Sequence, residues 1–116
     1  MIIENADGSL YFVTGAAGGS RIITATVQGV INVIDRGMTP VQALSEPRLH
    51  DQLIPNVAAM EADFDQETIE FMRGRGHNVT ELTIGASSAQ CIRLLSNGTF
   101  EAAGEPRQKN SGGLTI

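Results

Sequence analysis

The stretch that decides the fold is LYFVTGAAGGSRII at residues 10–23, where a strand-like run passes through glycines into an apolar helix. The strand-like part ends near Thr14, and the glycines follow at Gly15, Gly18 and Gly19. A strand, a glycine turn and a helix start leave backbone N–H groups unpaired and pointing outward. Adjacent glycines also let a ligand approach that backbone closely. The pattern predicts a site for an anion: a phosphate, a carboxylate or the oxyanion of an acyl-transfer intermediate.

Spacing argues against two nucleotide-binding motifs. A Walker loop, G-x-x-x-x-G-K-[ST], needs a lysine before the hydroxyl residue, and no lysine precedes Ser20. A Rossmann turn needs G-x-G-x-x-G, and the spacing of Gly15, Gly18 and Gly19 does not fit it. The local pattern alone leaves an ordinary tight turn as the alternative to an anion site.

Several ordered segments resemble the gamma-glutamyltranspeptidase family. The run VTGAAGGSRIIT at 13–24 is similar to the family's Gly-x-x-Gly-Gly-x-x-Ile stretch. NVIDRGM at 32–38 resembles the end of the family's helix, and ALSEPRLHDQ at 43–52 resembles its Ala-x-x-x-Pro-Arg-x-His segment. EPR at 105–107 resembles the family's tail. The likeness spans nearly the whole chain.

The resemblance implies an N-terminal-nucleophile hydrolase with an αββα sandwich, and this chain would form only part of that sandwich. Such enzymes cleave their own precursor into a large and a small subunit. The newly exposed Thr takes a γ-glutamyl group from glutathione or a related amide, with its own α-amine as the base. Gly18 and Gly19 match the family's glycine pair, whose backbone N–H groups form the oxyanion hole. The resemblance also favours a secreted, periplasmic or cell-surface protein.

The chain departs from the family at the nucleophile. The family's Gly-Thr-x-His segment does not occur, and the one Gly-Thr, Gly98-Thr99, precedes Phe100 in a predicted hairpin turn. We therefore expect the C-terminal part of a small subunit, without a nucleophile and inactive alone. Its partners would be the large subunit and the missing N-terminal part of the small subunit. The alternatives are a related acylase, such as a cephalosporin acylase-like or capsule-processing relative, and a catalytically dead binding or assembly module.

Composition predicts one domain over 1–116, because 116 residues with 41% hydrophobic content suit a single core. A net charge of −5 argues against nucleic acid as a partner. Cys91 is the single cysteine and there is no histidine cluster, so spacing predicts no metal site; no cofactor is expected either. Asn78 and Asn97 start N-glycosylation sequons, although Asn97 already has a reason to stand in a turn.

Turn and capping residues mark out the predicted elements. Hairpins are expected around Asp7-Gly8 and Asn97-Gly98. Thr39 and Pro40 begin a short helix, and Asp65 caps another. The predicted strands lie at 2–4, 10–14, 57–61, 79–82, 89–95 and 99–103, and the predicted helices at 21–35, 40–45 and 66–73. Pattern alone supports α+β with two hairpins.

Four side-chain roles and one segment complete the expectations. The apolar set of the helix at 21–35 is expected to face the core: Ile23, Val27, Val30, Ile31 and Ile34. Arg48 and His50 are assigned structural roles, with Arg48 tying down carbonyls or a carboxylate, and Cys91 is expected as a buried thiol. The glycine-rich tail at 108–116 is predicted to be mobile. A valine at Gly18 is expected to cripple acylation without disturbing assembly.

The missing strands have a physical consequence for the isolated chain. Without them, at least one sheet should expose an unpaired edge and apolar surface. We expect the chain to need its partner segment, to self-associate or to rearrange.

Overall fold

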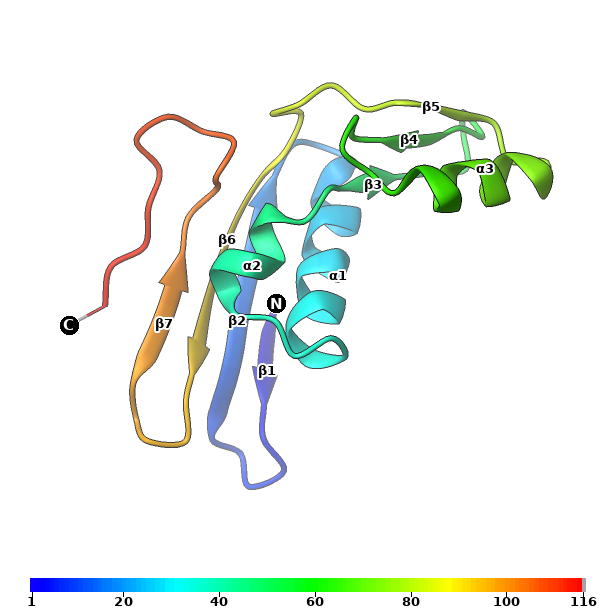
Figure 1. Cartoon of the computed structure of the whole chain (residues 1–116). Helices are drawn as coiled ribbons and strands as arrows, with labels where there is room; N and C mark the ends of the chain where they lie inside the picture. The colour runs from blue at the N-terminus through cyan, green and yellow to red at the C-terminus, as the bar shows by residue number, and fades with distance from the viewer. Residues whose placement is uncertain (116) are drawn as a thin grey trace.

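One antiparallel sheet of four strands, in the order β1-β2-β6-β7, organises the computed structural model, which describes residues 1–115 (Figure 1). Gly8 and Gly98, both at φ +83°, turn the two hairpins as predicted. The central pair β2 and β6 joins segments far apart in sequence, with Thr14 opposite Cys91. The strands are β1 Ile2–Glu4, β2 Leu10–Ala17, β6 Ser88–Leu94 and β7 Phe100–Ala103.

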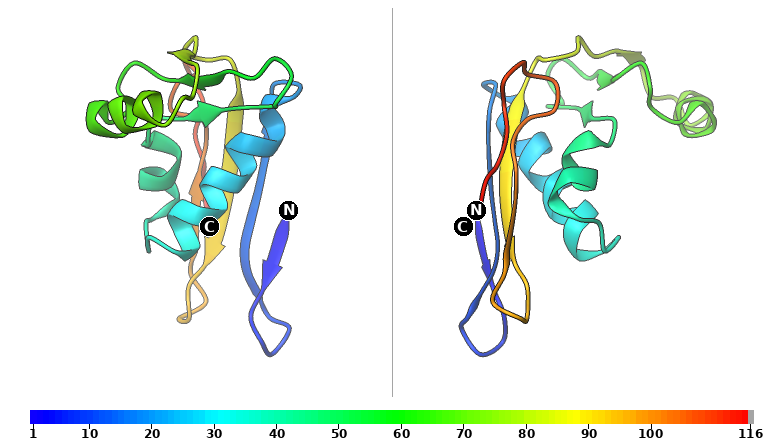
Figure 2. Two further views of the ribbon diagram at one scale, coloured as in Figure 1. Left: turned by 90° about the vertical axis from the view of Figure 1, so that its right-hand side faces the viewer. Right: turned by 60° about the vertical axis from the view of Figure 1, so that its left-hand side comes forward.

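Two helices, α1 Arg21–Ile34 and α2 Pro40–Ser45, cover one face of this sheet. Figure 2 (right) shows the sheet nearly edge-on, with both helices on the same side. The predicted capping box is present: the Thr39 side chain accepts from the N–H of Gln42, and the Gln42 side chain accepts from the N–H of Thr39. The expected short helix therefore begins and ends where its local sequence predicts.

A second, smaller sheet has the order β3-β4-β5 and carries α3. Its strands are β3 Leu49–His50, β4 Ala58–Met60 and β5 Val79–Glu81, and its helix is α3 Gln66–Gly74. Because β4 and β5 are parallel, the chain crosses over between them through α3. Asp65 caps α3 by accepting from the N–H of Thr68, as predicted, whereas β3 has no counterpart in the sequence-based expectation.

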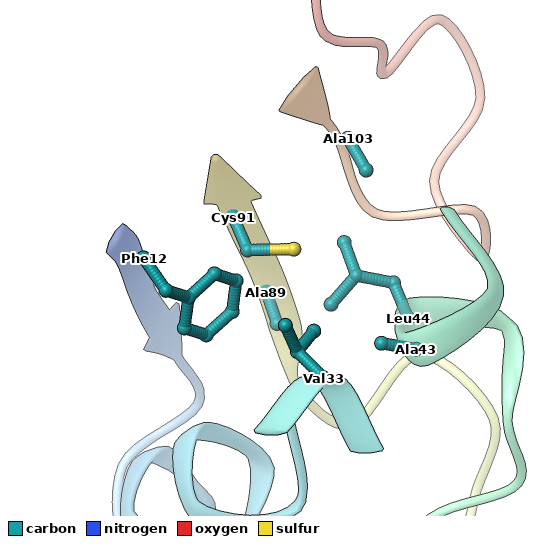
Figure 3. Packing of buried hydrophobic residues seen from close by; sticks show 7 residues of the cluster. All are labelled: Phe12, Val33, Ala43, Leu44, Ala89, Cys91 and Ala103. Carbon is teal, nitrogen blue, oxygen red and sulfur yellow. The ribbon is translucent and has the colours of Figure 1, made fainter. Parts of the chain in front are cut away.

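The main core lies between the sheet and the two helices (Figure 3). Every second residue of β2 and β6 points toward the helices, so that Phe12 and Cys91 are buried. The Cys91 thiol confirms the expected buried cysteine, and burial raises its pKa to about 11. The cluster consists of Phe12, Val33, Ala43, Leu44, Ala89, Cys91 and Ala103.

The buried face of α1 differs from the expected one at four of its five apolar residues. Ile23 is 71% exposed and Val27, Ile31 and Ile34 are 41–42% exposed, whereas Val30 packs against the core as expected. The helix instead buries small and polar side chains: Ala25, Thr26, Gly29, Asn32 and Val33. Gly29 faces Thr14 of β2, and a Cβ on Gly29 would stand 3.6 Å from the Thr14 hydroxyl oxygen, an ordinary contact distance. The helix contacts the sheet mainly through small and polar residues and leaves most of its apolar stripe exposed.

Figure 2 shows no helix on the sheet face opposite α1. That face carries an apolar row, whose end at Ala102 lies against Gly113 of the C-terminal segment. Strand register places Ile2 opposite Val13, Val13 opposite Ile92 and Ile92 opposite Ala102. Ile2 is 67% exposed and Ile92 is 41% exposed. One helix layer on one sheet is half of an αββα sandwich, which agrees with the predicted partial fold. None of the helices in residues 1–115 is long and apolar enough to cross a membrane.

Removing the largest buried side chain should destabilise the chain strongly. Phe12→Ala deletes a fully buried ring, and we expect it to lower the free energy of unfolding by about 3–5 kcal/mol in urea titrations. Phe71→Ala is the matched control, because Phe71 is 62% exposed on α3 and should lose less than about 1 kcal/mol. Equal losses for the two variants would contradict the assigned core.

The apolar row should make the isolated chain self-associate. We expect its weight-average mass in sedimentation experiments to rise with protein concentration. Ile92→Gln, in the row, should weaken this association, whereas Ile84→Gln, at an exposed isoleucine outside the row, should not. A monomer at all concentrations, with one sharp and concentration-independent unfolding transition, would count against this prediction.

Candidate functional site

The glycine turn is shorter than expected because β2 continues beyond Thr14. Gly15 pairs with Gln90 and Ala17 with Ser88, so the strand absorbs the first glycine. The turn then consists of Gly18 at φ +134°, Gly19 at φ +62° and Ser20, and α1 follows immediately.

The N–H groups of Gly18 and Gly19 donate to no acceptor within residues 1–115. Gly19 is exposed and Gly18 is half-buried. The Ser20 side chain makes no capping hydrogen bond to the first turn of α1, so it leaves the helix N-terminus open. Two adjacent free donors at the positive end of a helix can bind an anion or stabilise a developing oxyanion.

The surroundings of the two glycines differ. A Cβ on Gly18 would lie 2.8 Å from the Ala86 carbonyl oxygen and 2.9 Å from the Ser87 Cα, whereas a Cβ on Gly19 would meet nothing within 4 Å. A side chain at Gly18 would therefore force this backbone to shift, so we now expect a valine there to disturb the local fold as well as acylation. Gly19 is the position at which a side chain can obstruct the site without a clash.

Beneath the turn, Arg48 holds the start of β6. Its Nη1 donates to the Ser87 carbonyl oxygen and to the Ser87 hydroxyl, both at 3.3 Å. Its Nη2 lies 2.8 Å from Glu105 Oε2, and both side chains are almost completely buried. The prediction that Arg48 ties down carbonyls or a carboxylate is confirmed.

Glu105 and Arg107 extend this ion pair into a buried network. Glu105 Oε2 also accepts from the Ala89 N–H at 2.7 Å, and Arg107 Nε donates to Glu61 Oε1 at 2.7 Å. Burial would raise the pKa of Glu105, but the hydrogen bonds from Ala89 and Arg48 outweigh it and hold that pKa below its usual value. Burial would lower the pKa of Arg107, which its bonds to Glu61 instead raise. Both shifts favour the charged forms of Glu105 and Arg107.

Sequence reasoning missed the roles of Glu61 and Glu105. The EPR segment pointed to Glu105 only as part of a resemblance, and nothing local marked Glu61 as buried. One signal was available: an arginine that is buried needs a carboxylate partner, so burial of Arg48 and Arg107 would require two buried carboxylates elsewhere in the chain.

His50 makes structural contacts with both ring nitrogens. Its Nδ1 lies 2.9 Å from the Thr24 hydroxyl, and its Nε2 lies 3.1 Å from Gln52 Oε1. The contact with Thr24 ties β3 to the first turn of α1, and the contact with Gln52 is local, which fits the structural role assigned to His50.

The one Gly-Thr pair of the sequence lies far from the glycine turn. Thr99 belongs to the β6–β7 turn, and strand register places that turn at the opposite end of the sheet from Gly18. Five pockets among residues 1–115 have neither Gly18 nor Gly19 in their linings. That part of the chain also holds no group of three His, Cys, Asp or Glu side chains able to share a metal ion. It supplies donors for an anion.

Comparison with known proteins gives one consistent family. A model of the Gamma-glutamyltranspeptidase family matches residues 1–114. The chain is 61% identical over 99% of its length to the glutathione hydrolase proenzyme of Arthroderma benhamiae, covering 20% of that protein. It is 45% identical over 97% of its length to the glutathione hydrolase of Aspergillus flavus, covering 19%. It thus spans about a fifth of these curated relatives.

A solved structure agrees with these relatives. A mutant of Helicobacter pylori gamma-glutamyltranspeptidase superimposes with a TM-score of 0.85 at 28% identity, over 93% of this chain and 59% of that chain. The shared fold confirms the expected α+β class and the partial sandwich.

Acid should destabilise the chain partly through Glu105. Its pKa is lower in the folded than in the unfolded chain, so its stabilising effect is present above the unfolded value of about 4.3 and is lost as the pH falls through the folded pKa. Glu105→Gln should therefore show a shallower fall of urea midpoint below about pH 4.5 than the wild type. Glu70→Gln alters an exposed carboxylate and should keep the wild-type slope. Identical slopes for all three proteins would contradict this role of Glu105.

Proposed function

This chain belongs to the gamma-glutamyltranspeptidase family, and we propose that it is the C-terminal part of a small subunit, where Gly18 and Gly19 supply the oxyanion-hole N–H groups. The observation that carries the proposal is the pair of free, adjacent backbone donors at the N-terminus of α1. They stand in the segment that resembles the family's glycine motif. Hydrolysis or transfer of a γ-glutamyl group is the proposed reaction.

The geometry suits one step of acyl transfer. The Thr hydroxyl of the remaining small-subunit segment adds to the γ-carbonyl carbon and passes its proton to the Thr α-amine. The carbonyl oxygen becomes an oxyanion, which accepts hydrogen bonds from the N–H groups of Gly18 and Gly19. The leaving amine takes the proton as the C–N bond breaks, and a γ-glutamyl ester remains on the Thr. Water or an amine then releases the glutamyl group through a second, similar oxyanion.

The proposed partners follow from what this chain lacks. Its sequence does not contain the family's Gly-Thr-x-His segment, and it spans about a fifth of its relatives. We therefore assign the nucleophile, the groups that recognise the glutamyl α-carboxylate and α-amine, and the outer layers of the fold to the large subunit and the remaining part of the small subunit. The choice between hydrolysis and transfer also belongs to those parts.

A segment exchange tests the proposal directly. The chain replaces the corresponding segment of the Arthroderma benhamiae proenzyme, to which it is 61% identical. We expect this chimera to hydrolyse a chromogenic γ-glutamyl anilide, while the isolated 116-residue chain shows no turnover. A folded chimera without turnover would favour an assembly module, and preference for a glutaryl amide would favour a related acylase.

Within the chimera, Gly19→Ala keeps both N–H groups and adds a Cβ next to them, in space that no other atom within 4 Å occupies. On the proposed role this Cβ crowds the oxyanion away from the two donors, and we expect kcat to fall about 100-fold, as after removal of one oxyanion-hole donor. Gly8→Ala is the matched control, because Gly8 also has a positive φ and no neighbour within 4 Å but lies in the β1–β2 turn. It shares the backbone strain and should keep kcat within about twofold. Equal kcat values for the two variants would refute the oxyanion assignment.

A further inference from the structure

The position of Gly18 depends on the segment beneath it. The Ala86 carbonyl oxygen and the Ser87 Cα lie so close to Gly18 that a Cβ there would stand within 3.0 Å of both. Gly18 and Gly19 are bonded neighbours at the mouth of α1, so a shift of Ser87 moves the backbone that carries both free N–H groups. The direction of these donors therefore depends on what holds Ser87.

Buried charges hold Ser87 and its strand at two points. Arg48 donates to the carbonyl oxygen and hydroxyl of Ser87, and its other nitrogen pairs with Glu105. Glu105 accepts from the N–H of Ala89, two residues farther along β6. The guanidinium of Arg107 lies 3.2 Å from Glu105 and anchors it from the far side. The start of β6 is thus clamped from Ser87 to Ala89.

Stability alone is a weak explanation for this arrangement. Removing two charges from water costs several kcal/mol for each ion, and a well-packed apolar pair often stabilises a fold equally well. A buried pair does, however, hold its neighbours in one geometry. Oxyanion stabilisation needs that property, because its donors must stand within about 0.5 Å of the productive position before the charge develops.

We propose that Arg48 and Glu105 are positioning residues for the acyl-transfer step, holding Ala86 and Ser87 against Gly18 so that the N–H groups of Gly18 and Gly19 keep their direction. This proposal rests on the proposed function. It adds that the C-terminal loop, which carries Glu105, acts on the reaction through the start of β6 and touches no reacting atom.

The test uses the chimera and removes both charges together. Arg48→Met with Glu105→Gln leaves no unpaired charge between these two positions, and Arg107 keeps its ion pair with Glu61. We expect kcat to fall about 10- to 100-fold while KM changes less than about twofold, since the affected donors act in the transition state. Arg48→Lys keeps the positive charge but offers one nitrogen, which cannot bond Ser87 and Glu105 in the same geometry as the guanidinium. This variant should give a kcat between those of the wild type and the double variant.

The control is the exposed ion pair of α3. Arg73→Met with Glu70→Gln removes the same two kinds of charge at a surface site, and this variant should keep the wild-type kcat.

Combining the buried double variant with Gly19→Ala gives a second readout of the positioning role. If Arg48 and Glu105 act through the glycine turn, the two losses of kcat combine to less than their product. Independent, multiplying losses would indicate a structural role only.

Two outcomes separate this inference from the proposed function. If Gly19→Ala lowers kcat but the folded buried double variant keeps wild-type kcat, or changes KM alone, the positioning role is refuted and the oxyanion role stands. If Gly19→Ala keeps full activity, both the oxyanion role and the positioning role are refuted. Should the double variant fail to fold, Ser87→Ala decides, because it removes one bond from Arg48 without stranding a charge. A kcat loss of about 3- to 10-fold supports the positioning role, and an unchanged kcat overturns it.

Discussion

The buried ion pair of Arg48 and Glu105 is the interaction on which this arrangement depends. It joins the segment after α2, the start of β6 and the loop after β7, which come from distant parts of the sequence. Such a pair is costly to desolvate and is tolerated only because every part of it is satisfied. Arg107 completes that requirement by linking Glu105 to Glu61 and to carbonyl oxygens of α2 and its end. The result is a rigid platform under the glycine turn.

The glycine turn packs against this platform at Gly18 and is open at Gly19. Gly18 lies directly on Ala86 and Ser87, where no side chain fits, and Gly19 remains open to solvent. The two N–H groups are left without partners within residues 1–115, and this is the feature on which the proposed oxyanion role rests. Donors of this kind are effective because they are oriented before the reaction begins.

The uncovered surfaces have the character of internal layers. In the row on the sheet side away from α1, Ile2 and Ile92 are exposed, whereas Ala102 lies against Gly113. Along α1, the exposed stripe consists of Ile23, Val27, Ile31 and Ile34. A sheet and a helix each bury their apolar side against another element in a complete domain. The exposed row and stripe therefore agree with a chain that spans about a fifth of its relatives.

The sequence by itself determined the features that depend on neighbouring residues. The turns at Gly8 and Gly98, the capping box at Thr39 and the cap at Asp65 stand where they were predicted, because each is a contact over two to four residues. The glycine pair was also readable, since its spacing and its resemblance lie within one short segment.

Only the tertiary structure decided the features that depend on distant partners. Pairing with β6 extended β2 through Gly15 and Ala17, and packing against the sheet placed small and polar residues of α1 inward in place of its isoleucines. The parallel pair β4 and β5 and the meeting of Arg48 with Glu105 also arise from packing across the chain. Periodicity shows that a helix has an apolar stripe, but the partner that is present decides whether that stripe is buried.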